Sequence, residues 1–175
     1  KDSGVPIFEI PGYEADDIIA TLACKLRDEY DVFMVSKDKD LRQLLNEHVV
    51  MYDVQSDTNI DPKILREQRG YGPELSVEIQ TLIGDATDNV PGIPGVGEKT
   101  ALQLLNEFGS IDGIYANLDK LKSKKKLVEN LVNFKDRLKM SRELVTLRCD
   151  VPMELDISCC EFKGFNVEKV RPTLE

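Results

Sequence analysis

The sequence lacks tryptophan, has one histidine and contains no long apolar segment, although hydrophobic residues make up 41% of its 175 positions. A helix that crosses a membrane needs about 20 consecutive apolar residues, so we expect a globular protein. The absence of a signal peptide favours a cytoplasmic location. Because His48 is the only histidine, a nucleophilic mechanism of the Ser/His/Asp or Cys/His type has little support.

The cysteines lack the CxxC spacing that is typical of a zinc site. They are Cys24, Cys149, Cys159 and Cys160. Adjacent cysteines rarely bridge one another, so we expect reduced thiols and no bound zinc. The chain also lacks an initial methionine, and we therefore expect a piece of a longer protein.

Basic residues are in deficit, with 23 lysines and arginines against 32 acidic residues and a net charge of −9. Taken alone, this charge argues against a nucleic-acid partner. Seven of the acids, however, fall into three clusters, and bound cations would offset much of their charge. Net charge therefore does not decide the type of partner.

Alternating apolar runs and helical stripes predict an α/β domain over residues 1–56. β-branched runs predict strands over 5–10, 32–35 and 48–53, the second of them typical of a buried parallel strand. An apolar stripe up to Leu26 predicts a helix after the first strand.

Helical patterns dominate residues 57–175, which we interpret as a second, all-α domain. The predicted helices are 62–69, 75–83, 98–108, 111–118, a long helix 127–147 with a break marked by Ser141, and 165–174. Residues 149–164 are expected to be irregular.

Three clusters of acidic residues lie at the ends of predicted elements. They are Glu14, Asp16 and Asp17; Asp38 and Asp40; and Asp85 and Asp88. The first cluster could simply cap a helix, and the second could be a solvated loop in which Asp40 is an N-cap.

A catalytic interpretation starts from where the clusters lie. Asp38 and Asp40 follow a strand, where ligand sites of α/β sheets occur. The spacing of Asp85 and Asp88 would place them on one face of a helical turn. If the chain brings the clusters together, they could hold two divalent cations, which activate water for phosphodiester hydrolysis.

A glycine-rich turn over residues 91–97 follows the third cluster directly and precedes the helix 98–108. Glycines let a backbone approach a phosphate closely, and free N–H groups at a helix start favour an anion. Ile93 and Val96 are expected to point inward, and Lys99 adds a positive charge. The alternative is an ordinary turn without a ligand.

Five lysines form the one basic cluster in the sequence: Lys120, Lys122, Lys124, Lys125 and Lys126. Such a run is usually a solvated face. In a protein that grips DNA beside the turn, it could contact backbone phosphates.

Three segments carry a resemblance to a known family: GYEADDIIATLA, VSKDKDLRQLL and GDATDNVPGIPGVGEKTALQLL. They resemble the 5′→3′ exonuclease domain of bacterial DNA polymerase I, within the flap endonuclease family. The resemblance implies a PIN-like α/β sheet that bears a carboxylate cluster. It also implies a helix–three-turn–helix (helix-hairpin-helix) module that grips duplex DNA.

The same resemblance implies roles for individual residues. All seven clustered acids are implied to be catalytic ligands of Mg²⁺ or Mn²⁺, with Asp85 and Asp88 mainly at the second ion. Backbone carbonyls of Pro91, Ile93 and Val96 would bind a potassium ion. The residues implied to bind DNA are Gly92, Gly95, Gly97, Lys99 and Thr100.

The implied activity is a structure-specific 5′ nuclease that acts on flapped or nicked duplex DNA in primer removal and repair. We expect a monomer with polymerase domains in the same parent chain.

The family also carries metal-binding aspartates on earlier strands and a basic arch, which nothing before Lys1 supplies. Three alternatives stay open: a fragment that only binds duplex DNA, a stand-alone short exonuclease, and an acidic cation-binding or signalling domain with Asp38 as phosphoacceptor.

Overall fold

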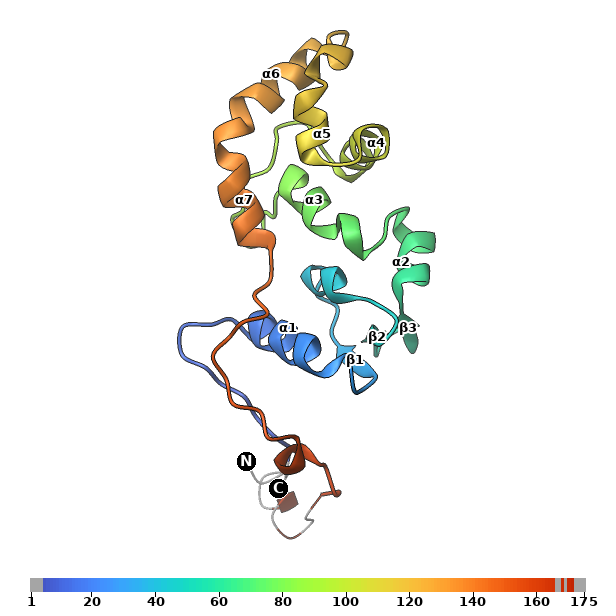
Figure 1. Cartoon of the computed structure of the whole chain (residues 1–175). Coiled ribbons are helices and arrows are strands. Elements are labelled where there is room, and N and C mark those ends of the chain that lie inside the picture. Colours follow the sequence, from blue (N-terminus) through green and yellow to red (C-terminus); the bar gives the residue numbers. More distant parts are fainter. Residues whose placement is uncertain (1–4, 166–167, 169, 172–175) are drawn as a thin grey trace.

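The structure, a computed structural model, describes residues 5–165, 168, 170 and 171. An α/β part precedes a helical part, so the predicted fold class is confirmed (Figure 1). The elements are, in order, α1 (Ala15–Leu26), β1 (Val32–Val35), β2 (Val49–Asp53), β3 (Thr58–Ile60), α2 (Pro62–Arg69), α3 (Pro73–Ile83), α4 (Glu98–Phe108), α5 (Ile111–Ala116), α6 (Lys125–Phe134) and α7 (Leu138–Val145). Short 3-10 helices span Asp40–Leu44, Leu118–Leu121, Lys135–Arg137 and Ile157–Cys160.

The sheet is mixed and has the strand order β1-β2-β3. β1 runs parallel to β2, with Val32 opposite Val49, and β2 is antiparallel to β3, with Met51 opposite Ile60. The sequence did not predict β3, because its short polar segment carries no alternating apolar pattern. Its pairing with β2 extends the sheet past residue 56.

The strand predicted over residues 5–10 is not formed. Ile7 is 68% exposed there, so β-branched composition alone does not make a strand without a packed sheet face. β1 also differs from the expected strand, because Phe33 and Val35 are exposed and only Met34 is buried. The apolar run therefore packs on one face instead of two.

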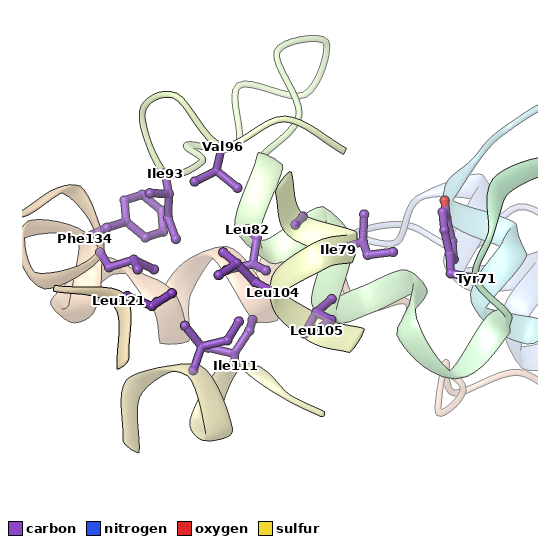
Figure 2. Close-up of a cluster of buried hydrophobic side chains, with 13 residues drawn as sticks. Tyr71, Ile79, Leu82, Ile93, Val96, Leu104, Leu105, Ile111, Leu121 and Phe134 are labelled. Carbon is purple, nitrogen blue, oxygen red and sulfur yellow. The ribbon is translucent and has the colours of Figure 1, made fainter. Parts of the chain in front are cut away.

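The helical part is built around one cluster of buried side chains, shown in Figure 2. Leu82 of α3, Leu104 of α4 and Leu131 of α6 each have at most 2% of their surface exposed. Ile93 and Val96 join this cluster, so the turn between α3 and α4 points apolar side chains inward as predicted. Their burial fixes the turn against the helices.

The predicted break at Ser141 is wrong. The long helix is interrupted at the 3-10 turn Lys135–Arg137, and Ser141 lies fully buried inside α7. Its hydroxyl donates a hydrogen bond to the Pro91 carbonyl at 2.9 Å. This serine therefore anchors the turn at 91–97 and does not end a helix.

After α7 the chain leaves the helical part and runs back along α1, beside the N-terminal segment (Figure 1). Residues 149–164 are irregular apart from the 3-10 turn Ile157–Cys160, as expected. The predicted helix 165–174 falls largely outside the described residues. All four cysteines are free thiols, and no helix among the described residues is long and apolar enough to cross a membrane.

Candidate metal centre and phosphate-binding hairpin

The first acid cluster stands at the start of α1. Glu14 occupies the N-cap position but makes no side-chain capping hydrogen bond, and Asp16 and Asp17 lie in the first turn. The capping alternative therefore fails for Glu14. Asp17 Oδ1 instead accepts a hydrogen bond from the backbone N–H of Arg148 at 2.9 Å.

The second cluster follows β1 in a loop shaped by local hydrogen bonds. Ser36 Oγ accepts from the Asp38 N–H, and Asp38 Oδ1 accepts from the Asp40 N–H, both at 3.0 Å. Asp40 then opens a 3-10 helix without acting as its N-cap. The Gln80 amide of α3 donates a hydrogen bond to Asp40 Oδ1 and so ties this loop to the helical part.

The third cluster does not lie on a helical turn, contrary to the prediction. α3 ends at Ile83, and Asp85 and Val90 form an isolated bridge with backbone hydrogen bonds of 2.9 and 2.7 Å. The bridge closes a turn that carries Asp88. Asp85 Oδ1 accepts from the Thr87 N–H at 2.9 Å, which sets the orientation of this carboxylate.

Asp40, Asp85 and Asp88 converge across the two parts of the chain. One carboxylate oxygen from each lies within 4.8 Å of the others. A cavity of about 470 Å³ is lined by these three and by the remaining four predicted acids: Glu14, Asp16, Asp17 and Asp38. The fold thus gathers all seven around one space.

Asp85 is the acid best placed to serve as a metal ligand. It is only 4% exposed, and its Oδ2 has no hydrogen-bond partner of standard geometry in the described part of the chain. Lys39 Nζ lies 2.6 Å from this oxygen and forms an ion pair with it. A buried carboxylate oxygen that already faces a positive charge can also bind a hard cation such as Mg²⁺.

The pKa values of the acids reflect their crowding. Burial, followed by the charges of Asp38 and Asp40, raises the pKa of Asp16. Burial also raises the pKa of Asp40, which the Gln80 hydrogen bond only partly opposes. Burial pushes the pKa of Asp85 upward as well, but Lys39 and backbone N–H groups outweigh it and leave that pKa lowered.

One wall of the cavity comes from residues 143–148, which the sequence did not predict as part of a site. Gln43 holds this wall with its amide, because Nε2 donates to the Val145 carbonyl at 3.0 Å and Oε1 accepts from the Leu147 N–H at 3.1 Å. Such contacts join residues about a hundred positions apart and leave no local pattern. Lys39, by contrast, lies in the sequence between the predicted ligands Asp38 and Asp40. That position could have identified it as a residue of the site.

The glycine-rich turn joins α3 to α4 as predicted. Gly84 and Gly92 face each other there, and a Cβ on Gly92 would overlap the Ile83 carbonyl. Gly92 is therefore required for packing. Gly97 has open space around its Cα and an ordinary backbone conformation, so its surface stays accessible to a ligand.

Two of the three predicted potassium-binding carbonyls already accept hydrogen bonds. Pro91 accepts from Ser141, and Ile93 accepts from the Val96 N–H at 3.0 Å. A carbonyl oxygen has two lone pairs, so each can also accept a second contact. Asn130 of α6 donates to the neighbouring Pro94 carbonyl at 2.7 Å and brings α6 beside the turn.

Comparison with known proteins agrees with this geometry. The family model "5′-3′ exonuclease, N-terminal resolvase-like domain" matches residues 1–70, and "5′-3′ exonuclease, C-terminal SAM fold" matches residues 71–168. The chain belongs to the 5′-3′ exonuclease family. The predicted family is thereby confirmed.

Relatives of this family include whole polymerases and shorter enzymes. DNA polymerase I of Bacillus subtilis is 42% identical over 168 residues, which cover 93% of this chain and 19% of the relative. A 5′-3′ exonuclease of Buchnera aphidicola is 39% identical over 161 residues, which cover 89% of this chain and 53% of the relative. The chain thus spans a minor part of the polymerases that it matches.

Among solved structures, the bacteriophage T5 D15 flap endonuclease in a pseudo-enzyme-product complex with DNA and metal ions superposes with a TM-score of 0.70. It is 27% identical, and the match covers 79% of this chain and 51% of the phage protein. Both parts of the fold are therefore those of a known nuclease family.

Proposed function

We propose that the chain is the metal-binding and DNA-binding part of a structure-specific 5′ nuclease that acts on flapped or nicked duplex DNA. The observation that carries the proposal is the convergence of Asp40, Asp85 and Asp88 within 4.8 Å, in a cavity that all seven predicted acids line. Like charges gathered this closely repel one another, and a bound cation would offset that repulsion.

We assign the acids to two divalent ions, Mg²⁺ or Mn²⁺. Glu14, Asp16 and Asp17 would hold the first ion, and Asp85 and Asp88 mainly the second. Asp38 and Asp40 complete the set, and a carboxylate oxygen of Asp40 lies within 4.8 Å of those of Asp85 and Asp88. When bound, such a pair supplies an activated water and stabilises the leaving oxygen of a phosphodiester. The protein's own contribution is to hold the carboxylates in place through the backbone contacts of Asp17, Asp38 and Asp85.

The hairpin is proposed to bind the duplex backbone. The exposed Gly95, Gly97 and Lys99 and the half-buried Thr100 offer backbone N–H groups, a hydroxyl and a positive charge at the start of α4. Gly92 acts through packing, and the carbonyls of Pro91, Ile93 and Val96 are proposed to hold a potassium ion against a phosphate.

We propose that the lysines at 120–126 extend this surface. Lys125 and Lys126 begin α6, which Asn130 fixes beside the hairpin. Their contact with phosphates would offset part of the net negative charge of the chain.

The parent protein is proposed to act in primer removal and DNA repair, as a cytoplasmic monomer. The polymerase relatives favour a parent chain with polymerase domains, and the shorter Buchnera exonuclease makes a stand-alone nuclease the alternative. We propose a boundary between the two domains near residue 56. Past this residue, β3 still pairs with β2 as a strand of the sheet, and α2 contacts β3.

The test is to incubate the chain with a 5′-labelled flap duplex in Mg²⁺ or Mn²⁺ and to measure cleavage and binding together. We expect the chain to cleave the flap duplex and Asp40→Asn to abolish this cleavage. The matched control is Asp53→Asn, which changes a half-buried carboxylate paired with Lys37 outside the cavity and should leave cleavage unchanged.

Salt-sensitive binding without cleavage, weakened by Lys99→Glu, would instead assign this chain a docking role. Cleavage that survives Asp40→Asn would contradict the proposed centre.

A further inference from the structure

Lys39 places a positive charge where the candidate site expects a cation. Its Nζ lies 2.6 Å from Asp85 Oδ2, and Asp40 and Asp88 add electrostatic attraction to it. These three carboxylates are the ones that converge within 4.8 Å. The ammonium group therefore contacts one of the three converging carboxylates and feels the charge of the other two.

The ion pair compensates one oxygen of the Asp85 carboxylate, whose other oxygen accepts from the Thr87 N–H. Asp85 Oδ2 is buried and lacks a hydrogen bond of standard geometry. A buried charge without a partner is costly, so Lys39 stabilises the metal-free arrangement. Its own side chain is 41% exposed, which leaves it room to move away.

Asp85 Oδ2 has more than one lone pair, but a lysine ammonium and a divalent cation beside it repel one another over a few ångströms. The two cations therefore compete for this oxygen. Divalent ions bring the greater charge and accept several oxygen ligands at once, whereas the ammonium group is tied to the loop between Asp38 and Asp40.

We propose that Lys39 is a tethered counter-ion that holds the second metal position in the metal-free protein and is displaced when a divalent ion binds. This inference rests on the proposed metal centre and adds a positioning residue to it. Lys39 keeps the three carboxylates together before the ion arrives. Because the incoming ion has to break the Lys39–Asp85 ion pair, it binds less tightly than it would without Lys39.

The test measures metal binding directly, without DNA or turnover. Mg²⁺ and Mn²⁺ are titrated into the wild-type chain and into Lys39→Met, with Mn²⁺ followed by electron paramagnetic resonance. We expect the variant to bind the ion that contacts Asp85 about three- to tenfold more tightly, because no ion pair has to be broken. Without metal, the variant should also unfold at lower temperature.

Lys37→Met is the matched control. Lys37 lies two residues earlier and pairs with Asp53 at 3.6 Å and with Gln55, outside the acid cluster. Its substitution removes the same net charge from the same loop. If the metal affinity rose equally in Lys39→Met and Lys37→Met, the change in net charge would explain the rise, and the proposal would be overturned.

A second measurement uses the wild-type chain and so does not depend on whether Lys39→Met folds. Side-chain ammonium NMR signals of Lys39 and Lys37 are followed during a Mg²⁺ titration. We expect the Lys39 signal to change with the midpoint of metal binding while the Lys37 signal stays nearly constant.

The outcomes separate the two proposals. Metal binding with an unchanged Lys39 signal, or with equal or weaker affinity in Lys39→Met, overturns the role of Lys39 and leaves the metal centre standing. No binding to either chain at millimolar metal overturns the centre itself.

Discussion

The backbone N–H of Arg148 donates a hydrogen bond to Asp17 Oδ1 at 2.9 Å, although 131 positions separate these residues. The contact places the segment after α7 directly on an acid of the candidate site. Thr21, one turn further along α1, accepts from the Val151 N–H and donates to the Arg148 carbonyl, both at 3.2 Å. The segment thus orients Asp17 through its backbone.

Thr21→Val tests whether this attachment stabilises the fold. The substitution keeps the shape of a fully buried side chain but leaves the Arg148 carbonyl and the Val151 N–H without their partner. We expect the free energy of unfolding to fall by about 1–3 kcal/mol, measured by urea denaturation. Thr146→Val is the control, because its exposed hydroxyl only contacts the preceding helical turn; an equal loss in both variants would contradict the role of Thr21.

Two glycines of the hairpin should respond differently to the same change. Gly92→Ala forces a methyl group into the Ile83 backbone, and we expect a loss of about 3 kcal/mol or more in unfolding free energy. Gly97→Ala meets no atom within 4 Å and should cost no more than about 1 kcal/mol.

Gly97→Ala should nevertheless weaken duplex DNA binding, because its methyl group lies where the backbone would meet a phosphate. Binding is measured by fluorescence anisotropy at two salt concentrations. Wild-type affinity in this folded variant would argue that the hairpin does not contact DNA at Gly97.

Because the pKa of Asp16 is raised, we expect the effect of Asp16 on stability to depend on pH. Its folded pKa lies above the unfolded value, so the folded state binds more protons in that range and this carboxylate opposes folding at neutral pH. In a chelator-containing buffer, Asp16→Asn should stabilise the protein by about 0.5 kcal/mol at pH 7. The gain should shrink as the pH falls through the folded pKa of Asp16 towards its unfolded value.

Asp53→Asn gives a control of opposite sign for that measurement. Backbone and side-chain hydrogen bonds and Lys37 lower the pKa of this half-buried carboxylate, so its charged form favours folding. The substitution should destabilise the protein at pH 7 and have less effect in acid. Urea denaturation at both pH values tests the pair, and a pH-independent gain for Asp16→Asn would contradict the crowding of the acids.

Divalent ions should stabilise the fold because they bind only when the acids are assembled. At a Mg²⁺ concentration of about 100 times its dissociation constant, the expected gain is about 2.7 kcal/mol, or a rise in melting temperature of about 5–10 °C. EDTA should reverse the shift. Asp40→Asn should reduce it, and an undiminished shift in that variant would place the ion elsewhere.

Much of the fold followed from local patterns in the sequence. The helix after Glu14, the strand that precedes Asp38 and the inward-facing Ile93 and Val96 depend on apolar periodicity and turn residues, which act over a few positions. The short strand β3 and the break before α7 were missed because their signals are weak over the same range. The strand expected over residues 5–10 failed because propensity does not supply a pairing partner.

The sequence by itself determined the ligand chemistry, since the type and spacing of the seven acids and the glycines of the hairpin are local properties. Only the tertiary structure decided that Asp85 meets Asp40, that Lys39 pairs with Asp85 and that residues 143–148 close the cavity. These contacts join distant segments through side-chain ion pairs, side-chain hydrogen bonds and burial, and such interactions carry no periodic signal along the chain.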